Sequence, residues 1–256
     1  MSITPFDSDD FNRSLFYPRA LTSPTPAHAR DLFVDVDGAR LHVRLHRPKD
    51  TACTLLLFHG NGEVVADYDD AAPAFAAAGA SLAVMDFRGY GASTGAPTLR
   101  NTIGDALPVL RALRHELSDP LVIMGRSLGS ACANEIYGAV DDVAFLGVVG
   151  VVLESGFTDL AGLIERRRLR APLPVNASDA AVFDPVPKLA RGALPLLVLH
   201  GGDDTLIEPR EAVVAHRSAA ARDKELVILE GHGHNDVSSA PAYWTSLRAF
   251  LARIVP

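Results

Sequence analysis

Short runs of consecutive apolar residues alternate with helix-like stretches over most of this chain, and this alternation restricts the possible fold more than any other feature. The runs lie at residues 54–58, 81–86, 121–124, 147–153, 194–199 and 225–229. Strands that are apolar on both faces are typical of a parallel sheet covered by helices on each side. We therefore predict an α/β fold. The intervening helices are expected near residues 66–78, 99–116, 208–220 and 240–253 and directly after residue 127.

Two strands of a different kind come before these runs. Residues 32–36 and 39–46 alternate apolar and polar side chains on either side of an Asp-Gly pair, which is a strong signal for a β-hairpin. The hairpin adds an antiparallel edge, so we predict a mostly parallel sheet of eight strands. His42 and His46 fall on one side of the second strand together with neighbouring arginines, and we expect that side to be a solvated face.

The length and composition fit one globular domain with an N-terminal arm. At 256 residues, with 48% hydrophobic and 21% charged side chains, the chain is long enough to bury a single sizeable core. Residues 1–30 carry several prolines and scattered aromatic residues, which predict an arm packed along the body. Residues 31–256 are assigned to a single domain.

Charge and hydropathy argue against several classes of partner. The net charge of −7 at pH 7 argues against nucleic acid, because phosphate binding needs clustered cations. No apolar segment approaches the length of a membrane span, and the N-terminus lacks the basic start and apolar segment of a secretory signal. The two cysteines, Cys53 and Cys132, cannot form a disulfide framework. We therefore expect a cytoplasmic protein.

The most informative motif is Gly-x-Ser-x-Gly at residues 125–129, directly after the apolar run 121–124. A strand that turns sharply into a helix needs glycines on both sides of the serine, because side chains there would clash with the neighbouring backbone. Such a turn exposes the serine hydroxyl at the carboxyl end of the sheet, so Ser127 is the candidate nucleophile. A second match surrounds Ser93, but a glycine-rich loop separates it from its strand, and we interpret it as a loop serine.

Chemically matched residues follow other predicted strands. Asp203 and Asp204 come after one strand, and His232 and His234 come after the last. The carboxyl ends of parallel strands meet at one edge of the sheet, where ligands bind. A serine hydroxyl becomes nucleophilic when an imidazole accepts its proton and a carboxylate orients that imidazole. The order serine, aspartate, histidine therefore predicts acyl transfer without a metal or organic cofactor, and the spacing matches no standard zinc signature.

Two backbone amides are candidates for stabilising negative charge. The run 54–58 is followed by a His-Gly-Asn-Gly turn, whose amides can point at a ligand oxygen. The amide of Leu128 faces the same edge from the first turn of the helix after Ser127. We predict that the amides of Asn61 and Leu128 form an oxyanion hole.

From about residue 31 to its end, the sequence resembles the α/β-hydrolase superfamily, in which a serine, an acid and a histidine follow successive strands. Its similarity to the branch of acyl-protein thioesterase-like (depalmitoylase-like) and serine aminopeptidase-like hydrolases lies in residues 59–62, 86–95, 154–157 and 233–236. The resemblance implies Asp204 rather than Asp203 as the acid and His234 rather than His232 as the base. It also implies a structural loop around Ser93.

The segment in which relatives in that superfamily carry a substrate-covering lid is short here. We expect a lid segment of about residues 157–192, made of one helix and an irregular return. Its arginine-rich stretch fits a solvated helix face. Alternatively, Arg166 and Arg168 reach the pocket mouth and attract an anionic substrate.

The sequence thus predicts a serine hydrolase that cleaves a carboxylic ester or thioester of a small-molecule acyl substrate. Gly62, Arg126 and Phe157 are further candidates for substrate contacts. A peptidase or amidase would use the same residues, and a binding protein could keep the fold without the chemistry. A dehalogenase is disfavoured because that chemistry needs a carboxylate at the position of Ser127.

Overall fold

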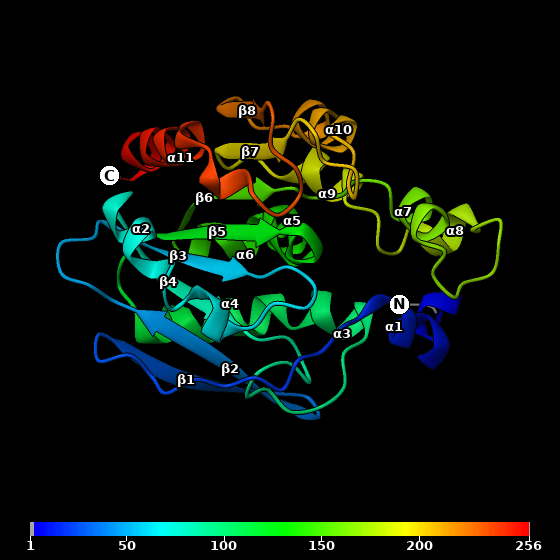
Figure 1. The fold of residues 1–256 in the computed structure, drawn as a ribbon, viewed down its shortest axis with the longest axis horizontal. Coiled ribbons are helices and arrows are strands. Elements are labelled where there is room, and N and C mark those ends of the chain that lie inside the picture. Colours follow the sequence, from blue (N-terminus) through cyan, green and yellow to red (C-terminus); the bar gives the residue numbers. More distant parts are fainter. Residues whose placement is uncertain (1–2, 256) are drawn as a thin grey trace.

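Eight strands form one sheet in the order β1-β2-β4-β3-β5-β6-β7-β8 (Figure 1). The computed structural model describes residues 3–255, apart from the side chains of residues 142 and 144. The strands are β1 (Ala29–Val36), β2 (Ala39–His46), β3 (Cys53–Phe58), β4 (Ala80–Met85), β5 (Leu121–Arg126), β6 (Val148–Glu154), β7 (Leu196–Gly201) and β8 (Lys224–Leu229). Strand β2 pairs antiparallel with β1 and β4, and the other pairs are parallel. The predicted α/β fold with an antiparallel edge is confirmed.

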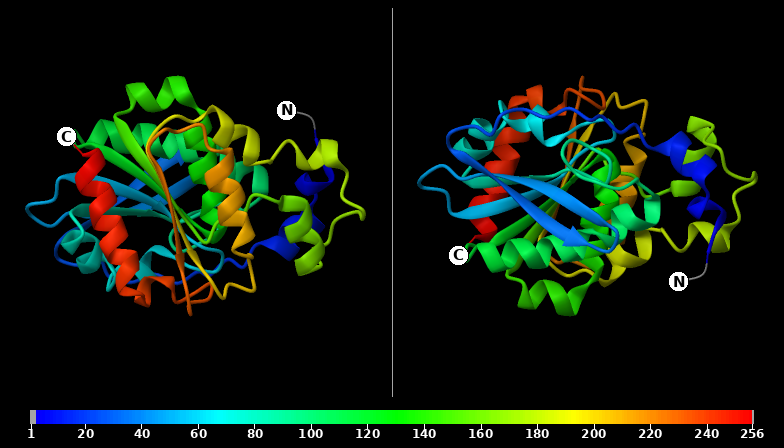
Figure 2. Two further views of the ribbon diagram at one scale, coloured as in Figure 1. Left: turned by 90° about the horizontal axis from the view of Figure 1, so that it is seen from above. Right: turned by 90° about the horizontal axis from the view of Figure 1, so that it is seen from below.

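Helices cover both faces of the sheet and divide its core into two clusters (Figure 2). The helices are α1 (Asp9–Leu15), α2 (Ala72–Ala77), α3 (Leu99–Gly104), α4 (Ala106–Glu116), α5 (Ser130–Gly138), α6 (Val140–Phe145), α7 (Leu160–Arg167), α8 (Ala177–Ala180), α9 (Val186–Arg191), α10 (Arg210–Ser218) and α11 (Pro241–Ile254). Residues of α2 and α11 belong to one cluster, and residues of α3, α4, α5, α9 and α10 belong to the other. No helix of the described residues is long and apolar enough to cross a membrane.

Two predicted helices are interrupted. The stretch 66–78 is a 3₁₀ turn, Val65–Tyr68, followed by the short helix α2. Pro73 stands in the first turn of α2, and because its nitrogen carries no hydrogen a helix cannot run unbroken through it. The stretch 99–116 divides into α3 and α4 at Asp105, whose carboxylate pairs with Arg88.

The prediction of a solvated face on β2 is wrong. His42, Arg44 and His46 are 4%, 2% and 1% exposed. Arg44 forms ion pairs with Asp31 and Asp69, and the chain segment before β1 lies over this face. The alternation identified the face correctly, but it carries no information about the segment that covers it.

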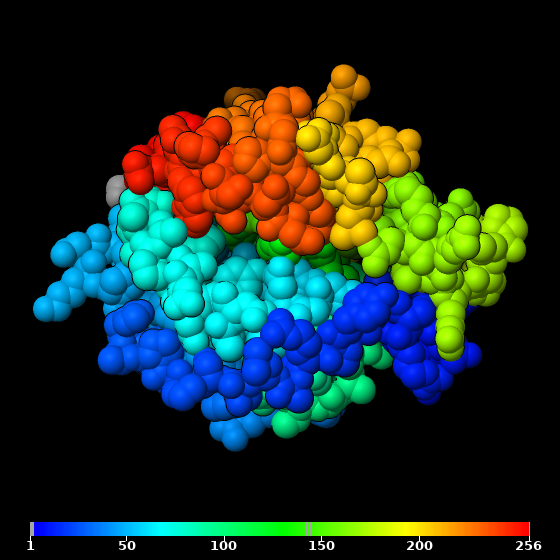
Figure 3. All heavy atoms as spheres, viewed as in Figure 1, coloured from blue at the N-terminus to red at the C-terminus, as the bar shows by residue number. Residues whose placement is uncertain are grey.

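The N-terminal arm packs against the lid segment at one end of the molecule (Figure 3). The ring centroids of Phe6 and Phe183 lie 6.0 Å apart. The hydroxyl of Ser14 accepts a hydrogen bond from the backbone amide of Arg170. The lid segment contains α7, α8 and α9 rather than the single helix that was predicted. We propose that residues 31–256 fold as one domain and that the N-terminal arm, residues 1–30, packs over part of its surface.

Candidate active site

The turn between β5 and α5 is the tightest point of the site. Ser127 has a φ of 50°, in the left-handed region that residues with side chains rarely adopt. A Cβ atom on Gly125 would lie 2.5 Å from the carbonyl oxygen of Gly129, and one on Gly129 would lie 2.0 Å from that of Phe58. The two glycines therefore allow the strand to turn into the helix against β3, with Ser127 at the tip.

A continuous hydrogen-bonded chain links three of the residues that the sequence predicted. The Nε2 atom of His234 lies 2.9 Å from the Oγ atom of Ser127, and its Nδ1 atom lies 2.7 Å from the Oδ2 atom of Asp204. Asp204 comes from the loop after β7, and His234 comes from the loop after β8. The structure thus brings these side chains together from three separate strand ends.

The alternative residues lie elsewhere. Asp203 is exposed, and its backbone amide donates to the carbonyl of His232. The Nδ1 atom of His232 lies 3.0 Å from the Glu230 carbonyl. Ser93 is buried in its loop, where its hydroxyl donates to the Asp86 carbonyl and accepts from the backbone amide of His42. None of the three joins the hydrogen-bonded chain of Ser127.

Asp204 is held as a carboxylate. Its burial alone would raise its pKa, but the nearby imidazole of His200 and hydrogen bonds with His234 and the Ile207 amide hold the pKa well below its ordinary value. Because an ionised carboxylate accepts hydrogen bonds and cannot donate, the proton between the two side chains belongs to the Nδ1 atom of His234. The Nε2 atom is then free to accept the proton of Ser127.

The loop after β3 brings Asn61 beside Ser127, and both residues line the same pocket as Leu128. The Asn61 side chain is fixed, because its Oδ1 atom accepts from the Tyr17 amide and the Tyr90 hydroxyl. In the described part of the chain, the backbone amide of Asn61 has no acceptor. The amide of Leu128 lies in the first turn after β5, where helical N–H groups lack a partner within the helix. Both N–H groups are therefore available to a ligand.

Arg126 connects the end of β5 to β6 and to the loops after β3 and β8. Its guanidinium forms ion pairs with Glu63 and, at 2.9 Å, with Glu154. It also donates to the Asn235 side chain, at 3.1 Å, and to the His234 carbonyl, at 3.4 Å. The side chain proposed as a substrate contact is thus committed to protein acceptors.

Glu63 was missed by the sequence analysis. Its carboxylate accepts hydrogen bonds from the Gly60 amide and the Tyr68 hydroxyl, at 2.7 and 2.6 Å, in addition to its pair with Arg126. It therefore fixes the turn that carries Asn61. A lone glutamate in a glycine-rich turn carries no sequence signal that would show which cation it meets.

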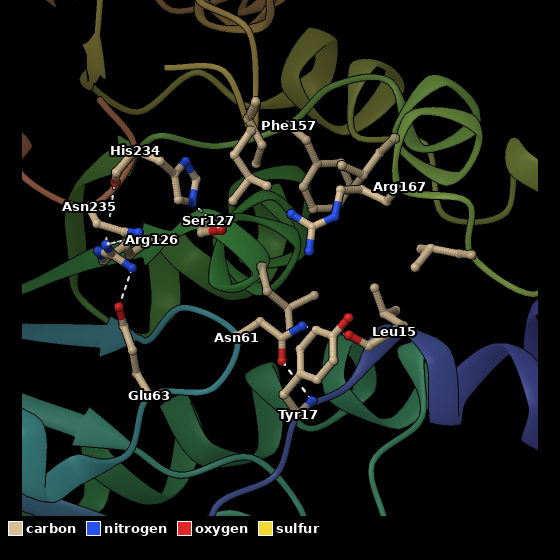
Figure 4. A pocket seen from close by; sticks show the side chains of 15 residues that line it. Leu15, Tyr17, Asn61, Glu63, Arg126, Ser127, Phe157, Arg167, His234 and Asn235 are labelled. Carbon is tan, nitrogen blue, oxygen red and sulfur yellow. Dashed lines mark hydrogen bonds and ion pairs between the residues drawn. The ribbon is translucent and has the colours of Figure 1, made fainter. Parts of the chain in front are cut away.

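A cavity of about 200 Å³ opens beside Ser127 (Figure 4). It is lined by Leu15, Tyr17, Asn61, Glu63, Arg126, Ser127, Leu128, Phe157, Leu163, Arg167, Leu169, Leu206, Ile207, His234 and Asn235. Phe157, a candidate for substrate contact, is thus one of the lining residues. Gly62 is absent from the lining, and its carbonyl accepts a hydrogen bond from Arg19. The N-terminal arm contributes Leu15 and Tyr17 to the lining, and no sequence motif indicates this contribution.

The alternative in which Arg166 and Arg168 reach the pocket mouth is wrong, because neither residue lines the pocket. The Arg166 guanidinium pairs with the buried carboxylate of Glu211 at 3.1 Å, and Arg168 is exposed just beyond α7. Arg167 lines the pocket instead. It lies one helical turn after Leu163, another pocket residue, and so shares its face of α7.

Comparisons with known proteins agree with this geometry. The sequence profile of the family described as serine aminopeptidase, S33, matches residues 49–172. An uncharacterized protein of Mycobacterium tuberculosis is 30% identical over 241 residues, which cover 88% of this chain and 80% of that protein. The chain belongs to the α/β-hydrolase superfamily, in its serine aminopeptidase-like branch.

Two further similarities bear on this hydrolase. The alpha/beta hydrolase domain-containing protein aho-3 of Caenorhabditis elegans is 28% identical over 169 residues, or 65% of this chain, and the match spans 47% of that longer protein. The structure of an esterase of Pyrococcus furiosus superposes with a TM-score of 0.74 and 18% identity, covering 93% of this chain and 99% of that one. At that identity, the superposition supports the α/β-hydrolase fold alone.

Proposed function

We propose that this hydrolase cleaves a carboxylic ester or thioester by acyl transfer to Ser127. The observation that carries the proposal is the hydrogen-bonded chain from Ser127 through His234 to Asp204 at the wall of a pocket. His234 accepts the hydroxyl proton as the Oγ atom attacks the substrate carbonyl, and Asp204 orients the ring and stabilises the imidazolium. The amides of Asn61 and Leu128 bind the negative oxygen that develops on the substrate.

The second half of the reaction uses the same groups. His234 gives its proton to the leaving alcohol or thiol, which departs and leaves the acyl group on Ser127. A water molecule that loses a proton to His234 then attacks the acyl carbonyl. The bond between the acyl carbon and Oγ breaks, His234 returns the proton to Ser127, and the carboxylic acid leaves. Every proton thus passes through the one imidazole.

The pocket supports an ester or thioester over the substrate of an aminopeptidase. An aminopeptidase must bind a free ammonium group, and a carboxylate is the acceptor that holds it most strongly. Glu63 is the acidic residue of the pocket lining, and its oxygens are already engaged by Arg126, Gly60 and Tyr68.

Cys53 and Cys132 are both free thiols, which supports a reducing compartment such as the cytoplasm.

The test compares an ester, a thioester and an amide that share one short acyl group. We expect turnover of the ester and thioester, with a loss of at least about a thousandfold in kcat for Ser127→Ala. Faster turnover of the amide would favour a peptidase or amidase. Binding of the panel without turnover would favour a non-catalytic protein of the same fold.

A further inference from the structure

The pocket beside Ser127 contains a positive charge that no residue of the described chain neutralises. The guanidinium of Arg126 is paired with Glu63 and Glu154. Arg167 lines the same pocket and has no ion-pair or hydrogen-bond partner within the described residues. The pocket wall therefore carries one uncompensated cation.

The register of α7 explains why Arg167 is unpaired while its neighbour is not. Successive helical residues are rotated by about 100°, so Arg166 faces another direction and meets Glu211. Arg167 follows Leu163 on the pocket face. Figure 4 shows its side chain extending from the helix into the pocket, on the side toward Ser127.

Arg167 is itself solvent-exposed, and half of the other residues that line the pocket are apolar. The apolar members of the lining are Leu15, Leu128, Phe157, Leu163, Leu169, Leu206 and Ile207. A carboxylate that binds there displaces water from the apolar wall, and its attraction to the guanidinium is then stronger than in bulk water. A guanidinium can also hold a carboxylate through two parallel hydrogen bonds.

The size of the cavity restricts the rest of the ligand. Its volume is about 200 Å³. Pockets for drug-sized ligands commonly measure about 300–1,000 Å³, so this cavity is a small one. A long fatty acyl chain would extend out of it.

We propose that the substrate is a short ester or thioester carrying a carboxylate, and that Arg167 binds this carboxylate. The inference rests on the proposed function and adds the chemical class of its substrate. The carboxylate belongs either to the acyl part or to the alcohol part of the ester. Arg167 is a specificity residue, with no role in proton transfer.

Two matched pairs of esters test the inference. Methyl hydrogen adipate and methyl hexanoate differ by a carboxylate on the acyl side. 4-Acetoxybenzoate and its methyl ester differ by one on the alcohol side. The measured quantity is the ratio of kcat/KM for the charged ester to kcat/KM for its neutral partner.

We expect Arg167→Gln to lower this ratio about tenfold in at least one pair, as the loss of a charge-assisted hydrogen bond implies. Arg168→Gln is the matched control, because it removes an equal charge from the exposed neighbour. It should leave both ratios at the wild-type value. The pair that responds identifies the side that carries the carboxylate.

An unchanged ratio in Arg167→Gln for both pairs would overturn the inference. An equal fall in Arg168→Gln would overturn it too, because the effect would then come from general charge. If the wild-type protein cleaves none of the four esters and neither the ester nor the thioester of the first panel, the proposed function fails, and a binding measurement then tests the inference separately. Calorimetric titration with methyl hydrogen adipate should then show about tenfold weaker affinity in Ser127→Ala/Arg167→Gln than in Ser127→Ala, and equal affinities would contradict it.

Discussion

Glu63 and Arg126 form an ion pair that ties the loop after β3 to the strand end preceding Ser127. The same guanidinium reaches Glu154 and the loop that carries His234. The three segments that supply the oxyanion amide, the serine and the histidine thus share one cation.

Replacing that cation should destabilise the fold. In Arg126→Met, the carboxylate of Glu154, which is 4% exposed, loses its cation and keeps only the hydrogen bond from the Tyr243 hydroxyl. We expect the free energy of unfolding, measured by urea denaturation, to fall by about 3 kcal/mol. Adding Glu154→Gln to Arg126→Met should recover part of the loss. A double variant no more stable than Arg126→Met would show that the unpaired carboxylate of Glu154 does not cause the loss of stability.

Asp204 and Asp203 provide a matched comparison within one loop. Asp204→Asn removes the carboxylate that fixes the tautomer of His234, so kcat should fall by about a thousandfold to ten-thousandfold. Asp203→Asn changes an exposed side chain and should retain activity near wild type. Steady-state kinetics on one ester checks both. The opposite ranking would assign the acid to Asp203.

Gly129 should tolerate no side chain. The Cβ atom of Gly129→Ala would lie 2.0 Å from the Phe58 carbonyl oxygen, so β3 and the turn must separate. We expect a loss of about 3 kcal/mol in the free energy of unfolding. Gly104→Ala is the control, because a Cβ atom there meets nothing within 4 Å, and it should stay within about 1 kcal/mol of wild type. Equal stability of the two variants in thermal or urea unfolding would contradict a close contact between the turn at Gly129 and β3.

His42 should make stability depend on pH in the neutral to alkaline range. Burial acts to lower the pKa of its imidazole, but a hydrogen bond with Asp86 and the carboxylate of Asp31, 3.0 Å from Nε2, raise it above the ordinary value of 6.5. A raised folded-state pKa means that the stabilisation is complete below about pH 6.5 and disappears as the pH rises through the folded-state pKa.

The difference in unfolding free energy between wild type and His42→Gln isolates this contribution. It should be larger at pH 6 than at pH 9. The comparison cancels the opposite trend of His46 and His59, in which burial lowers the pKa. A difference that stays constant, or that grows toward pH 9, would contradict a raised pKa for His42 in the folded protein.

The sequence predicted what local patterns control. Continuous apolar runs identified the parallel strands, and the glycines around Ser127 identified the sharp turn, because each depends on neighbouring residues alone. The order of Ser127, Asp204 and His234 placed them at one sheet edge, since parallel strands end on the same side.

The features that escaped prediction depend on contacts distant in the chain or on a single step of helical rotation. The cover over Arg44 comes from residues before β1 and from Asp69. The choice of Arg167 over its neighbours depends on one residue of helix register. Glu63 and Tyr17 gain their roles from partners that no local pattern specifies.

Labelling with a fluorophosphonate probe, followed by peptide mapping, tests the central claim most directly, because it needs no knowledge of the substrate. An activated nucleophile should be modified at Ser127, and folded His234→Ala protein should lose the label. Modification at Ser93 instead, labelling that persists in His234→Ala, or no labelling of the folded wild-type protein would contradict the proposed relay.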